Sequence, residues 1–180
     1  MKGIERFNKE LCAMSYGWYD RKGKLHLGLK DGDFVKEYRM QYPDEVKKHK
    51  NGVCWDLCEL EREYFKKRDI PFMTVFAVNK YMKNKPNHTF TIFKKNGKVY
   101  WFEASWDLMK GVREYNTIEE LFADFRKNFT YFVKGKPYVL EDVVFYRYKK
   151  PVSRISCNVF YIYCMFFGKK IRKDKKRLYS

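Results

Sequence analysis

One cysteine of this chain lies where a reactive thiolate is expected. Cys54 follows Gly52, which is typical of a turn, and apolar residues then recur at helical spacing from Val53 to Tyr64. Cys54 is therefore predicted to lie in the first turn of a helix. There, unpaired backbone N–H groups and the positive end of the helix dipole favour a thiolate over a thiol. A thiolate is the nucleophile that acyl transfer needs, provided that a base lies within reach.

The same helix is predicted to be amphipathic. Its apolar positions alternate with charged ones, including Asp56, Glu59 and Glu61, so one face is expected to pack and the other to meet solvent. Asp69-Ile70-Pro71 ends the pattern, because a proline disfavours helical backbone in the residue before it.

A base and an acid are supplied by a predicted hairpin. The strand-like runs 88–95 and 98–105 are joined by Asn96-Gly97, the strongest hairpin signal that a short sequence offers. A two-residue loop pairs Lys95 with Lys98 and fixes the register of every other pair.

In that register His88 and Glu103 are diagonal neighbours on one face of the sheet. A diagonal Cβ separation of roughly 7–8 Å is spanned when a Glu side chain reaches toward an imidazole. His88 and Glu103 are therefore predicted to interact, with Asp107 as the second candidate for the acid.

These residues and their spacing resemble the transglutaminase-like branch of the papain-like cysteine enzymes, over about a third of the chain. The matching pieces are Gly52-Val53-Cys54-Trp55-Asp56, Ile70-Pro71, His88-Thr89-Phe90 and Glu103-Ala104-Ser105-Trp106. The resemblance implies an α+β fold with a papain-like or transglutaminase-like core, in which the nucleophile helix packs on an antiparallel β-sheet.

The resemblance also implies roles for three residues: Cys54 as nucleophile, His88 as general base and Glu103 as the group that orients the imidazole. The family usually has Asp at the third position, and Glu is one methylene longer. Nothing in the sequence resembles the calcium sites or extra domains of animal transglutaminases, so protein cross-linking is not expected.

The expected reaction is thiol-dependent acyl transfer on a peptide or protein amide, and hydrolysis by a peptidase or deamidase is favoured over transamidation. No cofactor is expected. Cys54 and Cys58 do not form a structural zinc site, because such a site needs four Cys or His ligands. The backbone N–H of Cys54 is one candidate oxyanion donor, and a side chain of Gln41 or Tyr42 is the second. The competing function is a binding module without chemistry that uses a basic surface on nucleic acid or an acidic protein.

Composition indicates a single domain over residues 1–168, followed by a basic tail over residues 169–180. The net charge of +17 favours an acidic partner or nucleic acid, and the tail, with seven basic residues between Lys169 and Arg177, is predicted not to pack. The five cysteines are odd in number and follow no secretory signal, so a cytoplasmic location is expected. No apolar run approaches the roughly 18 residues of a membrane span.

The remaining elements are predicted from periodicity and turn residues. His26 and His49 have no acid partner in the sequence pattern and are expected to face solvent. Helices are expected near residues 4–14, 43–49 and 118–129, strands near 25–29, 72–81 and 138–148, and a break at 15–20.

Overall fold

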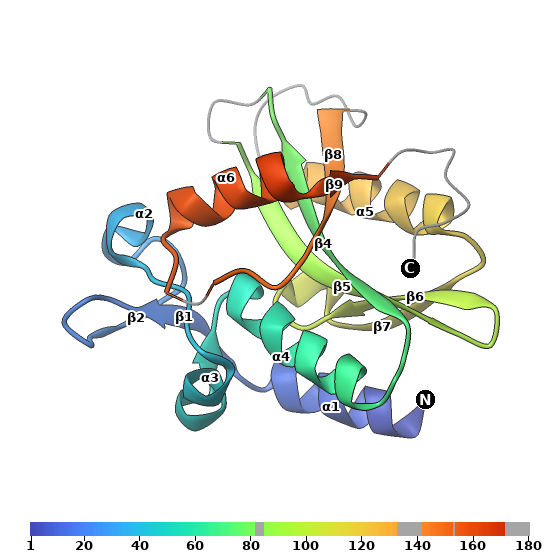
Figure 1. Cartoon of the computed structure of the whole chain (residues 1–180), viewed down its shortest axis with the longest axis horizontal. Helices are drawn as coiled ribbons and strands as arrows, with labels where there is room; N and C mark the ends of the chain where they lie inside the picture. The colour runs from blue at the N-terminus through green and yellow to red at the C-terminus, as the bar shows by residue number, and fades with distance from the viewer. Residues whose placement is uncertain (82–84, 133–141, 153, 172–180) are drawn as a thin grey trace.

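A computed structural model describes residues 1–81, 85–132, 142–152 and 154–171 of the chain (Figure 1). The described elements are, in order, α1 (Lys2–Cys12), β1 (Ser15–Tyr19), β2 (Leu25–Leu27), α2 (Phe34–Glu37), α3 (Pro43–His49), β3 (Asn51–Gly52), α4 (Cys54–Lys67), β4 (Phe72–Asn79), β5 (Asn87–Lys95), β6 (Lys98–Glu103), η1 (Asp107–Met109), β7 (Gly111–Tyr115), α5 (Ile118–Phe132), β8 (Val143–Tyr148), α6 (Cys157–Phe167) and β9 (Lys169–Lys170).

The main sheet contains six strands in the order β7-β6-β5-β4-β8-β9, and every neighbouring pair is antiparallel. A smaller sheet has the order β2-β1-β3, in which β1 and β3 run parallel. The chain is therefore an α+β protein whose main sheet is antiparallel, which confirms the predicted fold class at that level.

Helices cover both faces of the main sheet. Figure 1 shows α1, α4 and α6 in front of the sheet and α5 behind it. The helix that begins with Cys54 packs against β4 and β5, as predicted for the nucleophile helix. Because α4 crosses the middle of the sheet, its first turn reaches the end at which β5 begins.

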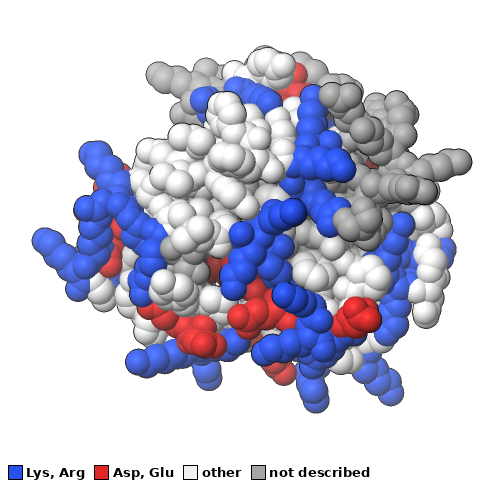
Figure 2. Space-filling model, viewed as in Figure 1, with Lys and Arg blue, Asp and Glu red and all other residues white. Residues whose placement is uncertain are grey.

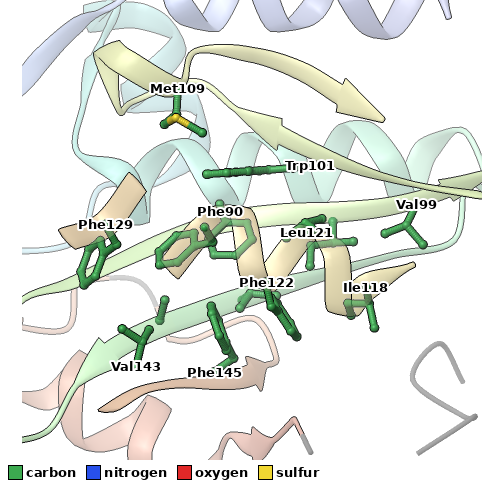
Figure 3. Close-up of a cluster of buried hydrophobic side chains, with 14 of the residues drawn as sticks. Phe90, Val99, Trp101, Met109, Ile118, Leu121, Phe122, Phe129, Val143 and Phe145 are labelled. Atoms are coloured by element: carbon green, nitrogen blue, oxygen red, sulfur yellow. The ribbon is translucent and has the colours of Figure 1, made fainter. Parts of the chain in front are cut away.

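The core behind the sheet is rich in aromatic side chains, as the composition suggests. Phe122 and Phe125 of α5 stack on strand side chains: the ring centroids of Phe122 and Phe145 are 3.9 Å apart, and those of Phe125 and Phe90 are 5.0 Å apart. Figure 3 shows Phe122, Phe90 and Phe145 among the side chains packed between α5 and the strands. This packing fixes the strands that carry the candidate site.

The predicted hairpin register is confirmed. Lys95 pairs with Lys98, and Thr91 pairs with Phe102. Asn96 and Gly97 have φ angles of 50° and 74°, as a two-residue type I′ turn requires.

The helix expected near residues 4–14 ends at Cys12, before the break expected at 15–20. The same stretch forms β1, a strand that the sequence did not indicate, which pairs with both β2 and β3. One prediction about the C-terminal end needs correction. The basic tail was predicted not to pack from residue 169, but Lys169 and Lys170 pair with β8, and Ile171 packs against the core. Residues 172–180, and residues 138–141 of the strand expected over 138–148, lie outside the described residues.

The prediction that His26 faces solvent is wrong. Its ring is buried and stacks on Trp18, with the ring centroids 4.3 Å apart. Nε2 lies 3.1 Å from Asp20 and Nδ1 lies 3.2 Å from Asp31. The acid partners come from the turns on either side of β2, where no periodicity marks them. His49 is exposed, as expected.

The prediction that the charged face of α4 meets solvent is also wrong in part. Asp56, Glu59 and Glu61 are all buried, because α4 lies between the sheet and the segments packed on its outer side. Glu59 is paired with Arg62 at 3.0 Å. For Glu61, burial raises the pKa to about 8.

Glu61→Gln is therefore expected to stabilise the protein in a pH-dependent way. The pKa of this carboxyl is about 8 in the folded chain and about 4.3 in the unfolded chain, so the folded protein keeps a proton that the unfolded chain has lost. The resulting loss of folding stability grows as the pH rises from about 4.3 to 8, and it is constant above pH 8. Urea unfolding at pH 5 and pH 8 measures the effect. At the higher pH, Glu61→Gln should raise the free energy of unfolding by on the order of 2 kcal/mol or more.

Glu119→Gln, at an exposed position of α5, is the matched control. A gain for Glu61→Gln that is equal at the two pH values would contradict the assignment of a protonated, buried Glu61.

Candidate active site

The start of α4 is held by a buried carboxylate. Asp56 accepts hydrogen bonds from the Val53 N–H at 3.0 Å, the Gln41 N–H at 2.9 Å and the Tyr38 hydroxyl at 2.7 Å. Burial raises the pKa of Asp56 to about 6, and these donors oppose the shift. Asp56 thus caps the helix and ties the segment before α3 to it, which fixes the backbone of Cys54, the first residue of α4.

His88 and Glu103 form the pair predicted from the hairpin register. His88 Nε2 lies 2.8 Å from Glu103 Oε2, which also accepts from Trp101 Nε1 at 3.2 Å. The other carboxylate oxygen accepts from the backbone N–H groups of Ser105 and Trp106, each at 2.9 Å, and from the Ser105 hydroxyl at 3.0 Å. Five donors thus surround a carboxylate that is fully shielded from solvent.

The imidazole contacts both the acid and the thiol. Burial lowers the pKa of His88, but the Glu103 charge and a side-chain hydrogen bond with Cys54 outweigh it and raise the pKa to about 10. Since Nε2 binds Glu103, Nδ1 is the ring nitrogen left for the thiol. Burial would also raise the pKa of Glu103, but the His88 charge and the backbone donors hold it below its usual value. Near neutral pH the ring is therefore an imidazolium.

A tyrosine that the sequence did not point to completes the site. Tyr16 lies on β1, and its backbone pairs with Gly52 of β3, two residues before Cys54. Burial, the charge of Cys54 and a side-chain hydrogen bond with Cys54 raise the pKa of Tyr16 well above its usual value. The phenol therefore keeps its proton and is a donor beside the sulfur. The parallel pairing of β1 with β3 leaves no local pattern from which Tyr16 could be predicted.

The other sequence candidates lie elsewhere. The Gln41 side chain donates to the Asn51 carbonyl at 3.2 Å and to Asp56 at 3.4 Å, so it belongs to the buried support of the helix start. Tyr42 is 48% exposed and caps α3. Asp107, the second candidate for the acid, is exposed and pairs with Lys110 at 2.7 Å.

Cys54 and His88 open into a pocket of about 1080 Å³. Its walls come from the loop after β2, from α2, from the segment after β6, and from the first turns of α6. Most of the lining is apolar, and Tyr16, but neither Gln41 nor Tyr42, is among the described lining residues. The arrangement gives a substrate direct access to the thiol.

Nothing in the described part of the chain forms a metal centre, because no three His, Cys, Asp or Glu side chains are grouped to hold an ion. Cys58, one turn after Cys54, is buried, and burial raises the pKa of its thiol well above the usual value. Cys58 is therefore a core residue, as the sequence indicated.

Comparison with protein-family models finds no match for this chain, and comparison with curated proteins finds no significant relative. Within the described ranges, no helix has both the length and the apolar character needed to cross a membrane.

The His88–Glu103 contact predicts a measurable change in the titration of His88. In the native protein the imidazolium should persist to about pH 10, as the raised pKa of His88 requires. In Glu103→Gln the attracting charge is gone while burial remains, so the pKa of His88 should fall by at least about two units. Proton and nitrogen chemical shifts of the ring, followed from pH 5 to pH 11 by NMR, measure both.

The rings of His26 and His49 provide the internal controls, since neither contacts Glu103. If His88 titrates at the same pH in both proteins, Glu103 does not hold the charge on the ring.

Proposed function

We propose that this protein catalyses cysteine-dependent acyl transfer on an amide bond through Cys54, His88 and Glu103, within a papain-like or transglutaminase-like core. The observation that carries the proposal is the position of His88. Its ring is hydrogen-bonded to the buried Glu103 carboxylate and interacts with Cys54, which lines the same open pocket. A nucleophile, a base and an orienting acid in contact are the arrangement that acyl transfer requires.

The reaction begins when the Cys54 thiolate attacks the carbonyl carbon of the substrate amide, which places a negative charge on the carbonyl oxygen. The His88 imidazolium then gives its proton to the leaving amine as the C–N bond breaks, and a thioester remains. The neutral His88 next takes a proton from water, and the resulting hydroxide releases the acyl group as a carboxylic acid. Glu103 stabilises the imidazolium form throughout and keeps its own charge.

The oxyanion needs two donors, and the structure offers two beside the sulfur. The backbone N–H of Cys54 is at the free N-terminal end of α4. The Tyr16 hydroxyl, which interacts with Cys54, is the second donor in this proposal and replaces Gln41 and Tyr42.

The substrate that this pocket fits best carries apolar or aromatic groups beside the amide. Leu27, Leu29 and Phe34 on one wall and Leu108 on another are available to such groups. Hydrolysis remains the favoured outcome, since the described residues around the pocket form no second site for an amine-bearing protein.

The rate at which Cys54 reacts with an electrophile separates this function from a binding module without chemistry, the alternative that the net charge of +17 supports. Iodoacetamide should alkylate Cys54 quickly at pH 6, because the sulfur lies at the start of a helix and interacts with the cationic His88 ring. His88→Ala should slow the reaction by at least about tenfold, since the cation is lost. Glu103→Gln should have a smaller effect. Peptide mapping by mass spectrometry measures the rate at each cysteine.

Cys157 is the matched control in the same pocket. Burial and the charge of Cys54 raise its pKa to about 11, so its thiol should be almost unreactive at pH 6. Alkylation of Cys54 at pH 6 that is no faster than that of Cys157 would rule out the enzyme and leave the binding module.

A further inference from the structure

The helix α6 is predominantly apolar but is covered on only one side. None of its residues from Cys157 to Phe167 is charged. Phe160 and Cys164 point into the core and are fully buried against the sheet. Besides Asn158, the side chains left uncovered are large and apolar: Val159 is 50% exposed, Ile162 51%, Phe166 80% and Phe167 78%. A helix this apolar is normally buried on every side, yet no described part of the chain covers the outer face of α6.

Basic residues border this face. Lys169 and Lys170 are exposed and follow the helix directly, while Lys149 and Lys150 are exposed on the segment that leads from β8 back to α6. Figure 2 shows a broad white area over α6 with blue side chains at its borders, whereas the red side chains gather over α3 and α4.

We propose that the outer face of α6, together with Lys169 and Lys170, binds the surface of an anionic phospholipid bilayer. The apolar side chains would enter the boundary between headgroups and acyl chains, while the lysines meet lipid phosphates. The helix lies in the plane of the surface, because its 11 residues span roughly 16 Å, about half of the hydrocarbon thickness.

Charge decides between a bilayer and other occupants of this face. A second copy of the chain would bring the same lysines against one another, and the net charge of +17 makes that contact unfavourable. Nucleic acid would be held by the lysines but would leave Val159, Ile162 and Phe166 exposed to water. An anionic bilayer satisfies both the apolar side chains and the charges.

The position of α6 links this surface to the pocket. Tyr161, on the side of α6 next to the exposed face, lines the pocket that contains Cys54. Binding through α6 would therefore hold the pocket close to the lipid surface. Lipid binding through α6 does not depend on acyl transfer at Cys54, because the binding of vesicles requires no substrate.

Vesicle sedimentation with the full chain tests the proposal. The protein should bind vesicles of phosphatidylcholine that contain about 30% phosphatidylserine, and it should bind pure phosphatidylcholine vesicles much less. Replacing both Ile162 and Phe166 by Ser should weaken binding by at least about tenfold, because two large apolar groups no longer leave water. The matched control replaces Leu25 of β2 and Tyr42, which precedes α3, by Ser; both side chains are exposed and lie outside the pocket lining, and this variant should bind like the native protein.

The contribution of the lysines to lipid binding is tested by a separate pair of variants. This pair also tests the proposal if the serine variant of Ile162 and Phe166 fails to fold. Lys169→Glu with Lys170→Glu should weaken binding to the anionic vesicles by at least about tenfold. Lys22→Glu with Lys24→Glu changes the net charge equally in an exposed turn between β1 and β2, and it should weaken binding much less.

Three results would overturn the proposal. The first is equal binding to both kinds of vesicle, or binding that none of the α6 variants changes. The second is a dimer in light scattering that the Ile162 and Phe166 replacements dissociate, because the face would then bind a second copy. The third is binding to DNA or to polyglutamate that these replacements weaken while vesicles are not bound, because the partner would then be an acidic macromolecule.

Discussion

The site depends on one buried ion pair, the contact between the His88 ring and the Glu103 carboxylate. A carboxylate removed from water is unfavourable unless donors replace its hydration, and the structure supplies five. Two of them are backbone N–H groups of the residues that follow Glu103, so the chain must bend at the end of β6 to deliver them. The same bend brings Trp106 against the His88 ring, with the centroids 5.5 Å apart. The path of the backbone after β6 thus follows from the need to supply hydrogen-bond donors to the buried Glu103 carboxylate.

A second buried carboxylate positions Cys54, the proposed nucleophile. Asp56 fixes the first turn of α4 and, through Tyr38 and Gln41, the segment in front of it. The hairpin and the helix are separate elements, and each carries its own buried acid that is saturated with donors. The Cys54–His88 contact forms where the two supports meet, at the end of the sheet. Rigid support of this kind preorganises a catalytic group and leaves little to rearrange during the reaction.

The sequence predicted the features that local rules determine, and it missed those that depend on contacts between distant segments. The Asn96-Gly97 turn set the register, and the register alone placed His88 beside Glu103. The buried roles of Asp56 and Glu61 could not be predicted, because on a helical wheel they read as solvent-facing charges. Tyr16 was missed because a two-residue parallel pairing between β1 and β3 brings it to Cys54.

The central claim is that Cys54 is a nucleophile for acyl groups, and a trapped acyl-enzyme tests it most directly. The native protein would be mixed with the p-nitrophenyl ester of an N-acylated phenylalanine, whose ring suits the apolar pocket, quenched in acid and mapped by mass spectrometry. The account predicts a burst of nitrophenol close to one equivalent per chain and an acyl group on Cys54 alone, both lost in Cys54→Ser and strongly reduced in His88→Ala. Acylation spread over the exposed lysines, or unchanged in His88→Ala, would contradict it.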